Sequence, residues 1–131
     1  MKPATERAAM PILLIEDEPS VTAFLRAALE RNGYAVVPAS SGAQGLQLLE
    51  TREFRGVISD IRMPGSVNGA EVHAWIQRHR PELSSRIILI SGDTANPETQ
   101  RFLETSGTPC IEKPFRVHTF ISVVETTFGE P

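Results

Sequence analysis

Short, continuous runs of apolar residues recur along the chain and are separated by longer polar segments. The runs lie at residues 12–15, 34–37, 56–58, 86–90 and 110–111. Because their apolar residues are continuous rather than alternating, they are typical of parallel strands that are covered on both faces. The pattern therefore predicts five strands.

The segments between these runs repeat apolar residues at helical spacing. Residues 41–50 and 96–106 have the weaker periodicity of further helices, and glycines at 33, 107 and 129 stand where helices would stop. The repeat predicts three apolar stripes that face the core: Val21, Phe24, Leu25, Ala28 and Leu29; Val72, Trp75 and Ile76; and Val117, Phe120, Ile121, Val124 and Phe128. Strand and helix thus alternate, which predicts an α/β fold with an open parallel sheet between two helical layers.

The length of 131 residues allows one domain. We place that domain at residues 11–128, after a short lead-in at 1–10, and expect no output domain. The net charge is −3 without a basic block, and no apolar run could span a bilayer, so neither nucleic acid nor membrane is expected as a partner. Residues 1–10 lack the apolar segment of a secretory signal, and the sequence contains one cysteine, Cys110. We therefore expect a cytoplasmic protein in which Cys110 is a small buried apolar residue rather than a redox sensor.

Reactive side chains follow four of the five runs. They are Glu16, Asp17 and Glu18 after the first, Asp60 after the third, Ser91 after the fourth and Lys113 after the fifth. Because ligands of open α/β sheets bind beyond the carboxyl ends of the strands, we expect these groups to converge at one edge. Carboxylates suit Mg²⁺, and a carboxylate can accept a phosphoryl group whose charge Lys113 would neutralise.

Each of these residues also has an ordinary structural explanation. Glu16, Asp17 and Glu18 could be acids favoured by a helix N-terminus, Asp60 could be a turn residue, and Lys113 could be solvated. Only the conjunction at four strand ends favours one shared chemistry. The three histidines, His73, His79 and His118, share no metal-ligand spacing and are interpreted as helix-surface residues.

The same residues resemble the signature of response-regulator receiver domains of two-component signalling. The motifs are Glu16-Asp17, Asp60 with Met63-Pro64, Ser91-Gly92 and Lys113-Pro114-Phe115, and the resemblance covers about residues 11–128. It implies a flavodoxin-like (βα)5 sheet with strand order 2-1-3-4-5, and a signalling domain rather than an enzyme. It also implies a cis bond between Lys113 and Pro114.

The resemblance also implies roles for individual residues. Asp60 matches the phosphoacceptor, and Mg²⁺ or Mn²⁺ would be bound by Glu16, Asp17, Asp60 and the backbone carbonyl of Arg62. Ser91 matches the switch hydroxyl, and Lys113 matches the lysine that pairs with the phosphoryl group. The donor would be a sensor histidine kinase or a histidine phosphotransfer protein, and the signal would pass by contact to an unknown downstream protein.

Two positions depart from the usual receiver pattern. The loop after Asp60 is one residue longer, as in receivers attached to hybrid kinases, and Cys110 stands where many receivers have a Tyr or Phe that swings inward. We also expect Arg62 and Asp93 to pair across the site and to slow hydrolysis of the phosphoryl group.

Two other classes of protein remain as alternatives. An aspartate-nucleophile phosphatase usually carries a second acid two residues after the nucleophile, where this chain has Arg62. A flavodoxin-like cofactor-binding module would need a Ser/Thr/Gly-rich phosphate loop after the first strand, where this chain has Glu16-Asp17-Glu18-Pro19.

Overall fold

The computed structural model describes residues 9–62, 65 and 67–131, so Met63 and Pro64 of the motif after Asp60 lie outside the described residues. The strands are β1 (Ile12–Ile15), β2 (Val36–Ala39), β3 (Gly56–Asp60), β4 (Ile87–Ser91) and β5 (Cys110–Glu112). The helices are α2 (Pro19–Arg31), α3 (Gly42–Thr51), α4 (Gly69–His79), α5 (Pro97–Ser106) and α6 (Val117–Phe128), with a short 3-10 helix η1 (Pro81–Leu83).

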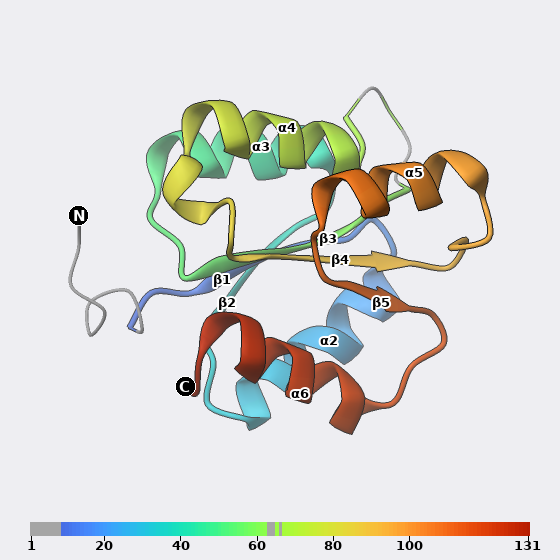
Figure 1. Ribbon diagram of the computed structural model, residues 1–131. Helices are drawn as coiled ribbons and strands as arrows, with labels where there is room; N and C mark the ends of the chain where they lie inside the picture. Colours follow the sequence, from blue (N-terminus) through green and yellow to red (C-terminus); the bar gives the residue numbers. More distant parts are fainter. Residues whose placement is uncertain (1–8, 63–64, 66) are drawn as a thin grey trace.

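All five strands are parallel and lie in the order β2-β1-β3-β4-β5, which confirms the predicted fold. Helices α3, α4 and α5 cover one face of the sheet, and α2 and α6 cover the other (Figure 1). One core cluster is formed mainly by β-strand residues with α2 and α6, and a second by strand residues with α3, α4 and η1. The sheet is therefore buried on both faces, as its continuous apolar runs predict.

The predicted helix stops are confirmed where a left-handed backbone is needed. Gly33 follows the end of α2 with φ 92°, and Gly107 follows α5 with φ 64°. Such positive φ values are readily adopted by glycine because it has no Cβ. The short connections after these glycines direct each chain segment back into the sheet.

Four expectations need correction. The second strand begins at Val36 rather than at residue 34, because the Tyr34 amide donates to the Leu29 carbonyl at the end of α2 (3.0 Å). Phe24 and Val117 are exposed, although each is part of a predicted core stripe. His73 is buried rather than on the helix surface, and its Nε2 lies 2.9 Å from the Thr108 hydroxyl.

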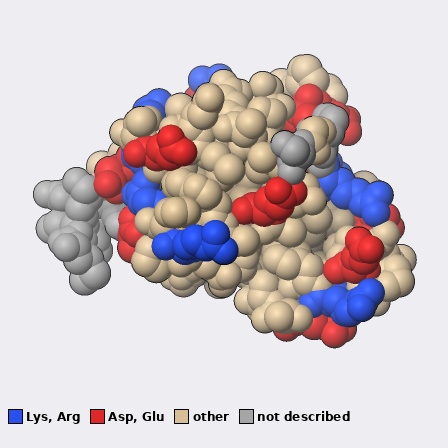
Figure 2. Space-filling model, turned by 90° about the horizontal axis from the view of Figure 1, so that it is seen from above, with Lys and Arg blue, Asp and Glu red and all other residues tan. Residues whose placement is uncertain are grey.

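The surface over α3, α4 and α5 mixes positive and negative side chains, with no large area of one sign (Figure 2). Trp75 on this side is half-buried and packs against the second core cluster, as predicted. Within the described residues, no helix combines the length and the apolar character that a membrane span requires.

Candidate functional site

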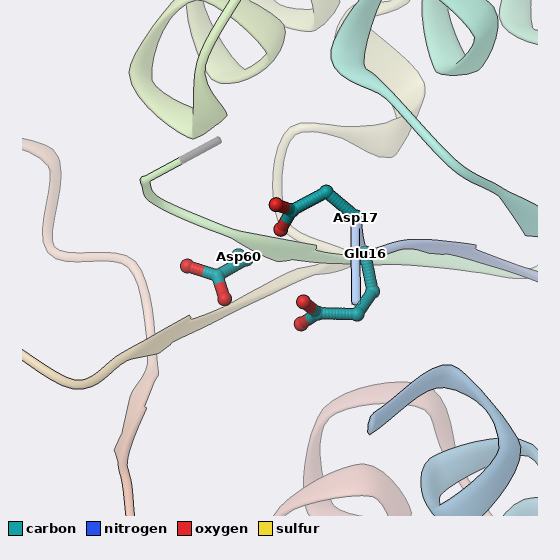
Figure 3. A group of neighbouring side chains, drawn as sticks. All are labelled: Glu16, Asp17 and Asp60. Atoms are coloured by element: carbon teal, nitrogen blue, oxygen red, sulfur yellow. The ribbon is translucent and has the colours of Figure 1, made fainter. Parts of the chain in front are cut away.

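Three carboxylates meet at the carboxyl edge of the sheet. Glu16 and Asp17 directly follow β1, and Asp60 is the last residue of the neighbouring strand β3, where Ile15 is in register with Ser59. One oxygen from each of the three carboxylates lies within 4.8 Å of the others. The side chains point toward one another from two strands, as Figure 3 shows. The predicted convergence of these acids is therefore observed.

The two innermost carboxylates are almost completely buried. Glu16 is 1% exposed and Asp60 is 6% exposed. Backbone amides orient them: Glu18 N–H donates to Glu16 Oε1 (3.2 Å), and Arg62 N–H donates to Asp60 Oδ1 (3.0 Å). The second oxygen, Glu16 Oε2, is buried and has no hydrogen-bond partner among the described residues. A buried oxygen of this kind is costly unless a further ligand satisfies it.

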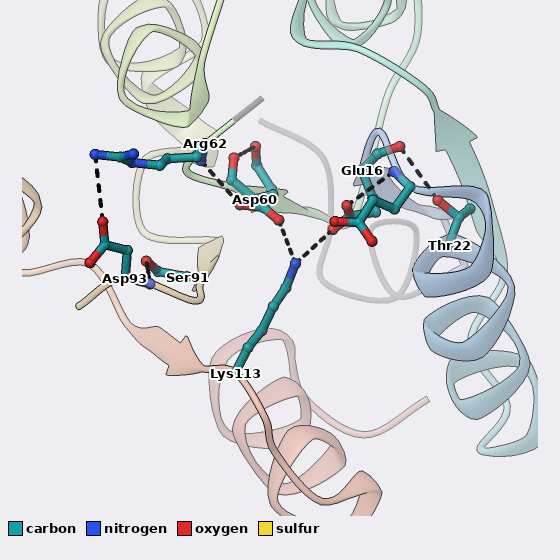
Figure 4. Close-up of polar contacts among 9 residues, drawn as sticks. Glu16, Thr22, Asp60, Arg62, Ser91, Asp93 and Lys113 are labelled. Atoms are coloured by element: carbon teal, nitrogen blue, oxygen red, sulfur yellow. Dashed lines mark hydrogen bonds and ion pairs between the residues drawn. The ribbon is translucent and has the colours of Figure 1, made fainter. Parts of the chain in front are cut away.

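Lys113 brings the positive charge of the cluster. Its Nζ donates to Asp60 Oδ2 at 2.6 Å and lies 3.6 Å from Glu16 Oε2 (Figure 4). The Lys113–Pro114 bond is cis, as predicted. One ammonium thus contacts two members of a cluster of three carboxylates, so the cluster is short of positive charge.

The pKa shifts report the same imbalance. Burial and the neighbouring charge of Asp60 raise the pKa of the Glu16 carboxyl to about 7. Burial alone lowers the pKa of Lys113, but the hydrogen bond and charge of Asp60 outweigh it and raise this pKa above its ordinary value. Without a further cation, the Glu16 carboxyl is therefore partly protonated near neutral pH.

The carboxylate set fits a hard divalent cation. Mg²⁺ is bound in proteins by oxygen atoms, commonly one or two carboxylates completed by waters and phosphate oxygens. Glu16, Asp17 and Asp60 offer such oxygens at mutual distances that one ion can bridge, and the unsatisfied Glu16 Oε2 is one of the atoms that a cation would neutralise.

Ser91 and the pair Arg62–Asp93 lie beside this cluster. Ser91 is the buried last residue of β4, and its Oγ accepts from the Asp93 amide (3.1 Å). Arg62 Nη2 lies 3.6 Å from Asp93 Oδ2, which confirms the predicted pairing of these two exposed side chains (Figure 4). The pair connects the segments that follow β3 and β4.

An open groove of about 530 Å³ adjoins the cluster on the α2 side. It is lined mainly by apolar groups from α2 and from the segment after β5: Ser20, Val21, Phe24, Gly92, Lys113, Pro114 and Phe115. The exposed Phe24 (48%) belongs to it. Sequence reasoning missed this surface because Phe24 has the spacing of a core residue. Its position could have indicated the groove, because Phe24 lies only five residues after the start of α2, at the end of the helix that faces the acids.

Residues 12–125 match the family model of the response regulator receiver domain. The chain belongs to this family. Receiver domains are signalling domains of two-component systems, which confirms the resemblance inferred from the motifs. The predicted signalling domain is thereby confirmed.

Curated relatives are considerably longer than this receiver domain. The transcriptional regulatory protein GlrR of Escherichia coli is 37% identical over 81 residues, which cover 62% of this chain and 18% of the relative. The CAI-1 autoinducer sensor kinase/phosphatase CqsS of Vibrio cholerae is 35% identical over 97 residues, which cover 73% of this chain and 14% of the relative. Because some relatives are named as transcriptional regulators, the expected absence of nucleic-acid partners stays a prediction.

Solved structures share the fold of this receiver domain. The CheY-like receiver domain protein of Methanospirillum hungatei has a TM-score of 0.81 at 24% identity, covering 91% of this chain and 93% of that chain. The receiver domain of a signal transduction histidine kinase from Syntrophus aciditrophicus has a TM-score of 0.81 at 25% identity, covering 91% and 89%.

Proposed function

We propose that this receiver domain accepts a phosphoryl group from a phosphohistidine onto Asp60. The observation that carries the proposal is the convergence of three carboxylates with Lys113 at the end of the central strand. Glu16, Asp17 and Asp60 would hold Mg²⁺ or Mn²⁺ together with the backbone carbonyl of Arg62. The unsatisfied Glu16 Oε2 supports this assignment.

In the proposed transfer, a carboxylate oxygen of Asp60 attacks phosphorus and forms a P–O bond. The P–N bond to the donor histidine breaks, and the imidazole keeps the electron pair. Lys113 would stay close to the transferred group and neutralise part of its charge, because its Nζ already contacts Asp60. The bound divalent cation would neutralise the remaining charge on the phosphoryl oxygens.

Ser91 is proposed to report the phosphorylated state. Its hydroxyl lies at the end of β4, next to β3, and Asp60 is in register with Ile90. A phosphoryl group on Asp60 would offer the hydroxyl proton an acceptor, and a rotation of Oγ toward it would change the present contact in which Oγ accepts from the Asp93 amide. The reorientation would alter the segment that leads to α5.

Cys110 replaces the Tyr or Phe that swings inward in many receivers, so the aromatic part of the usual response is missing. It is half-buried on β5, and burial raises the pKa of its thiol to about 11, so it is protonated at neutral pH. The thiol is therefore a poor nucleophile, in agreement with an apolar rather than a redox role. The readout would depend on Ser91 and the α5 segment, and would pass to a downstream protein by contact.

The donor is proposed to be a sensor histidine kinase or a histidine phosphotransfer protein. The apolar groove next to Lys113 supports a protein donor, because it offers Phe24, Val21 and Phe115 as contact surface close to Asp60. A named sensor kinase among the relatives contains a segment similar to this chain. The phosphatase alternative gains no support from the site, since exposed Arg62 occupies the position of its second acid. The cofactor-binding alternative gains none either, since the acids Glu16 and Asp17 follow β1 where it would need a phosphate loop.

The experiment is mass spectrometry of the intact protein after incubation with acetyl phosphate and Mg²⁺. We expect an adduct with the mass of one phosphoryl group that is stable in acid and labile in base. EDTA and Asp60→Asn should each abolish it, while the control variant Asp93→Asn should keep it. An adduct that survives in Asp60→Asn, or no adduct in the wild type, contradicts the proposal.

A further inference from the structure

The loop between β3 and α4 is held at both of its ends. The Gly69 amide donates to the Ile61 carbonyl (2.9 Å), and Asn68 caps α4 by accepting from the Glu71 amide (3.0 Å). At the start of the loop, the Arg62 amide donates to Asp60 Oδ1. The two ends of the loop are thus tied to Ile61 and to the carboxylate of Asp60.

A residue far from the motifs lies against this loop. Gly42 is the first residue of α3, and a Cβ at this position would lie 2.3 Å from Val67 O and 2.7 Å from Val67 Cγ1. The nearest obstacle is backbone, which cannot rotate away as the end of a side chain can. The side chain of Val67 also packs against the second core cluster.

The close packing continues to the site itself. A Cβ at Gly69 would lie 2.6 Å from the carbonyl oxygen of Asp60 and 2.7 Å from Ile61 Cα. The segment 67–69 is thus wedged between α3 and the end of β3. A side chain at Gly42 would therefore displace Val67, and with it the segment that packs against Asp60.

We propose that Gly42 is a positioning residue of the phosphoacceptor site, because its missing side chain lets Val67 pack against α3 and lets the segment 67–69 lie against the end of β3. This inference rests on the function proposed above. Gly42 would set the affinity of the site for a divalent cation by fixing Gly69 against the backbone of Asp60 and Ile61. It would not touch the cation or the phosphoryl group.

Helix propensity alone predicts the opposite effect of replacing Gly42. Within a helix, glycine is about 0.5–1 kcal/mol less favourable than alanine. The helix start is already capped, since Ser41 accepts from the Gln44 amide (3.1 Å). Gly42→Ala should therefore help α3 as an isolated helix while it displaces the loop.

Gly107 provides a control for a loss of stability. It has φ 64° and open space around it, so Gly107→Ala strains the backbone without a contact to Val67.

The experiment measures Mg²⁺ affinity by isothermal titration calorimetry and the Mg²⁺ dependence of labelling by acetyl phosphate. We expect Gly42→Ala to raise the Kd for Mg²⁺ about tenfold, the lower end of effects seen when groups supporting a metal site are changed. The labelling midpoint should move with it, while saturating Mg²⁺ restores the labelled fraction. Unfolding would instead lower that fraction without moving the midpoint.

Gly107→Ala should bind Mg²⁺ as the wild type does. If Gly42→Ala does not fold, Val67→Ala tests the same seat, and we expect it to raise the Kd by a smaller factor. Wild-type affinity in Gly42→Ala, or in Val67→Ala where that variant is needed, overturns the inference, as does an equal shift in Gly107→Ala. A wild type that neither binds Mg²⁺ nor is labelled overturns the proposed function itself.

Discussion

The two ends of the sheet treat buried charge in opposite ways. At the carboxyl end, Glu16 and Asp60 share one ammonium, and Glu16 Oε2 has no hydrogen bond within the described part of the chain. At the amino end, Arg55 is as deeply buried (3% exposed), but its Nε and Nη2 donate to the Phe128 carbonyl at 3.1 and 3.0 Å. The carboxyl end therefore has too little positive charge for its buried carboxylates, whereas at the amino end carbonyl oxygens accept the hydrogen bonds of the buried guanidinium.

The amino end uses this compensation to hold the end of α6. Arg55 also donates to the Glu130 carbonyl and lies over the Tyr34 ring at 5.1 Å. The Tyr34 hydroxyl donates to the Gly129 carbonyl at 2.7 Å, and Arg86 donates to the Phe128 carbonyl at 3.1 Å. The C-terminus of a helix attracts cations, so these contacts suit the local charge as well as the geometry.

The difference shows how burial serves stability at one end and ligand binding at the other. A buried charge with complete partners is part of the fold, whereas one without them creates affinity for an ion of opposite sign. Removing a buried charged side chain should therefore destabilise the fold at the amino end and relieve repulsion between carboxylates at the carboxyl end.

The largest effect is expected at the amino end. Arg55→Met should lower the free energy of unfolding by roughly 2–4 kcal/mol, because carbonyls at the end of α6 lose charged donors. Urea denaturation measures the loss. Labelling of Asp60 in the folded protein should persist. Arg26→Met is the control, since Arg26 is exposed and pairs only loosely with Glu30 (3.4 Å). Equal stability of the two variants would remove the contrast between the ends.

Mg²⁺ should have the next largest effect, at the carboxyl end. At a free concentration of about 100 times its Kd, the ion should stabilise the protein by about 2.7 kcal/mol. Thermal unfolding in Mg²⁺ and in EDTA measures this gain. Glu16→Gln should be more stable than the wild type in EDTA, because one of the opposed carboxylates is removed, and should gain less from Mg²⁺. A Glu16→Gln variant that is less stable in EDTA would contradict this account.

His73 provides a smaller, pH-dependent test of buried charge away from both ends. Burial lowers its pKa below the ordinary value of 6.5, so the unfolded chain takes up a proton first as the pH falls. Stability should therefore decrease as the pH drops through about 6.5, and His73→Gln should lose less stability over the same interval. Chemical denaturation at a series of pH values measures it. His118→Gln, at an exposed histidine, should behave as the wild type.

The smallest effect on stability is expected for Arg62→Ala. The pair with Asp93 is exposed on both sides, so it contributes only about 0–1 kcal/mol. Its proposed role is to limit access of water to phosphorylated Asp60. The variant should lose the phosphoryl group faster with an unchanged unfolding curve. An unchanged rate of dephosphorylation would show that the pair has no such role.

The strands, the strand-end residues and the helix stops were predictable because each depends on nearby sequence. The proximity of Asp60 and Lys113 could be predicted from the sequence, since parallel strands end at a common edge of the sheet. The burial of Phe24 and of His73 was predicted wrongly, because helical spacing does not show which residues of a helix are covered by neighbouring elements. The contacts of Arg55 with α6 and of Gly42 with Val67 join distant backbone segments, which no residue pattern reveals.

The length of β3 has a practical consequence for building reporters from this domain. Its five residues, at about 3.3 Å each, separate the turn before Gly56 from Asp60 by roughly 17 Å. The turn after η1 lies at the same amino edge, where Ser85 is exposed. A fluorophore or inserted peptide at Ser85 should leave phosphate uptake intact. The same insertion between residues 61 and 69 would disturb the phosphoacceptor directly.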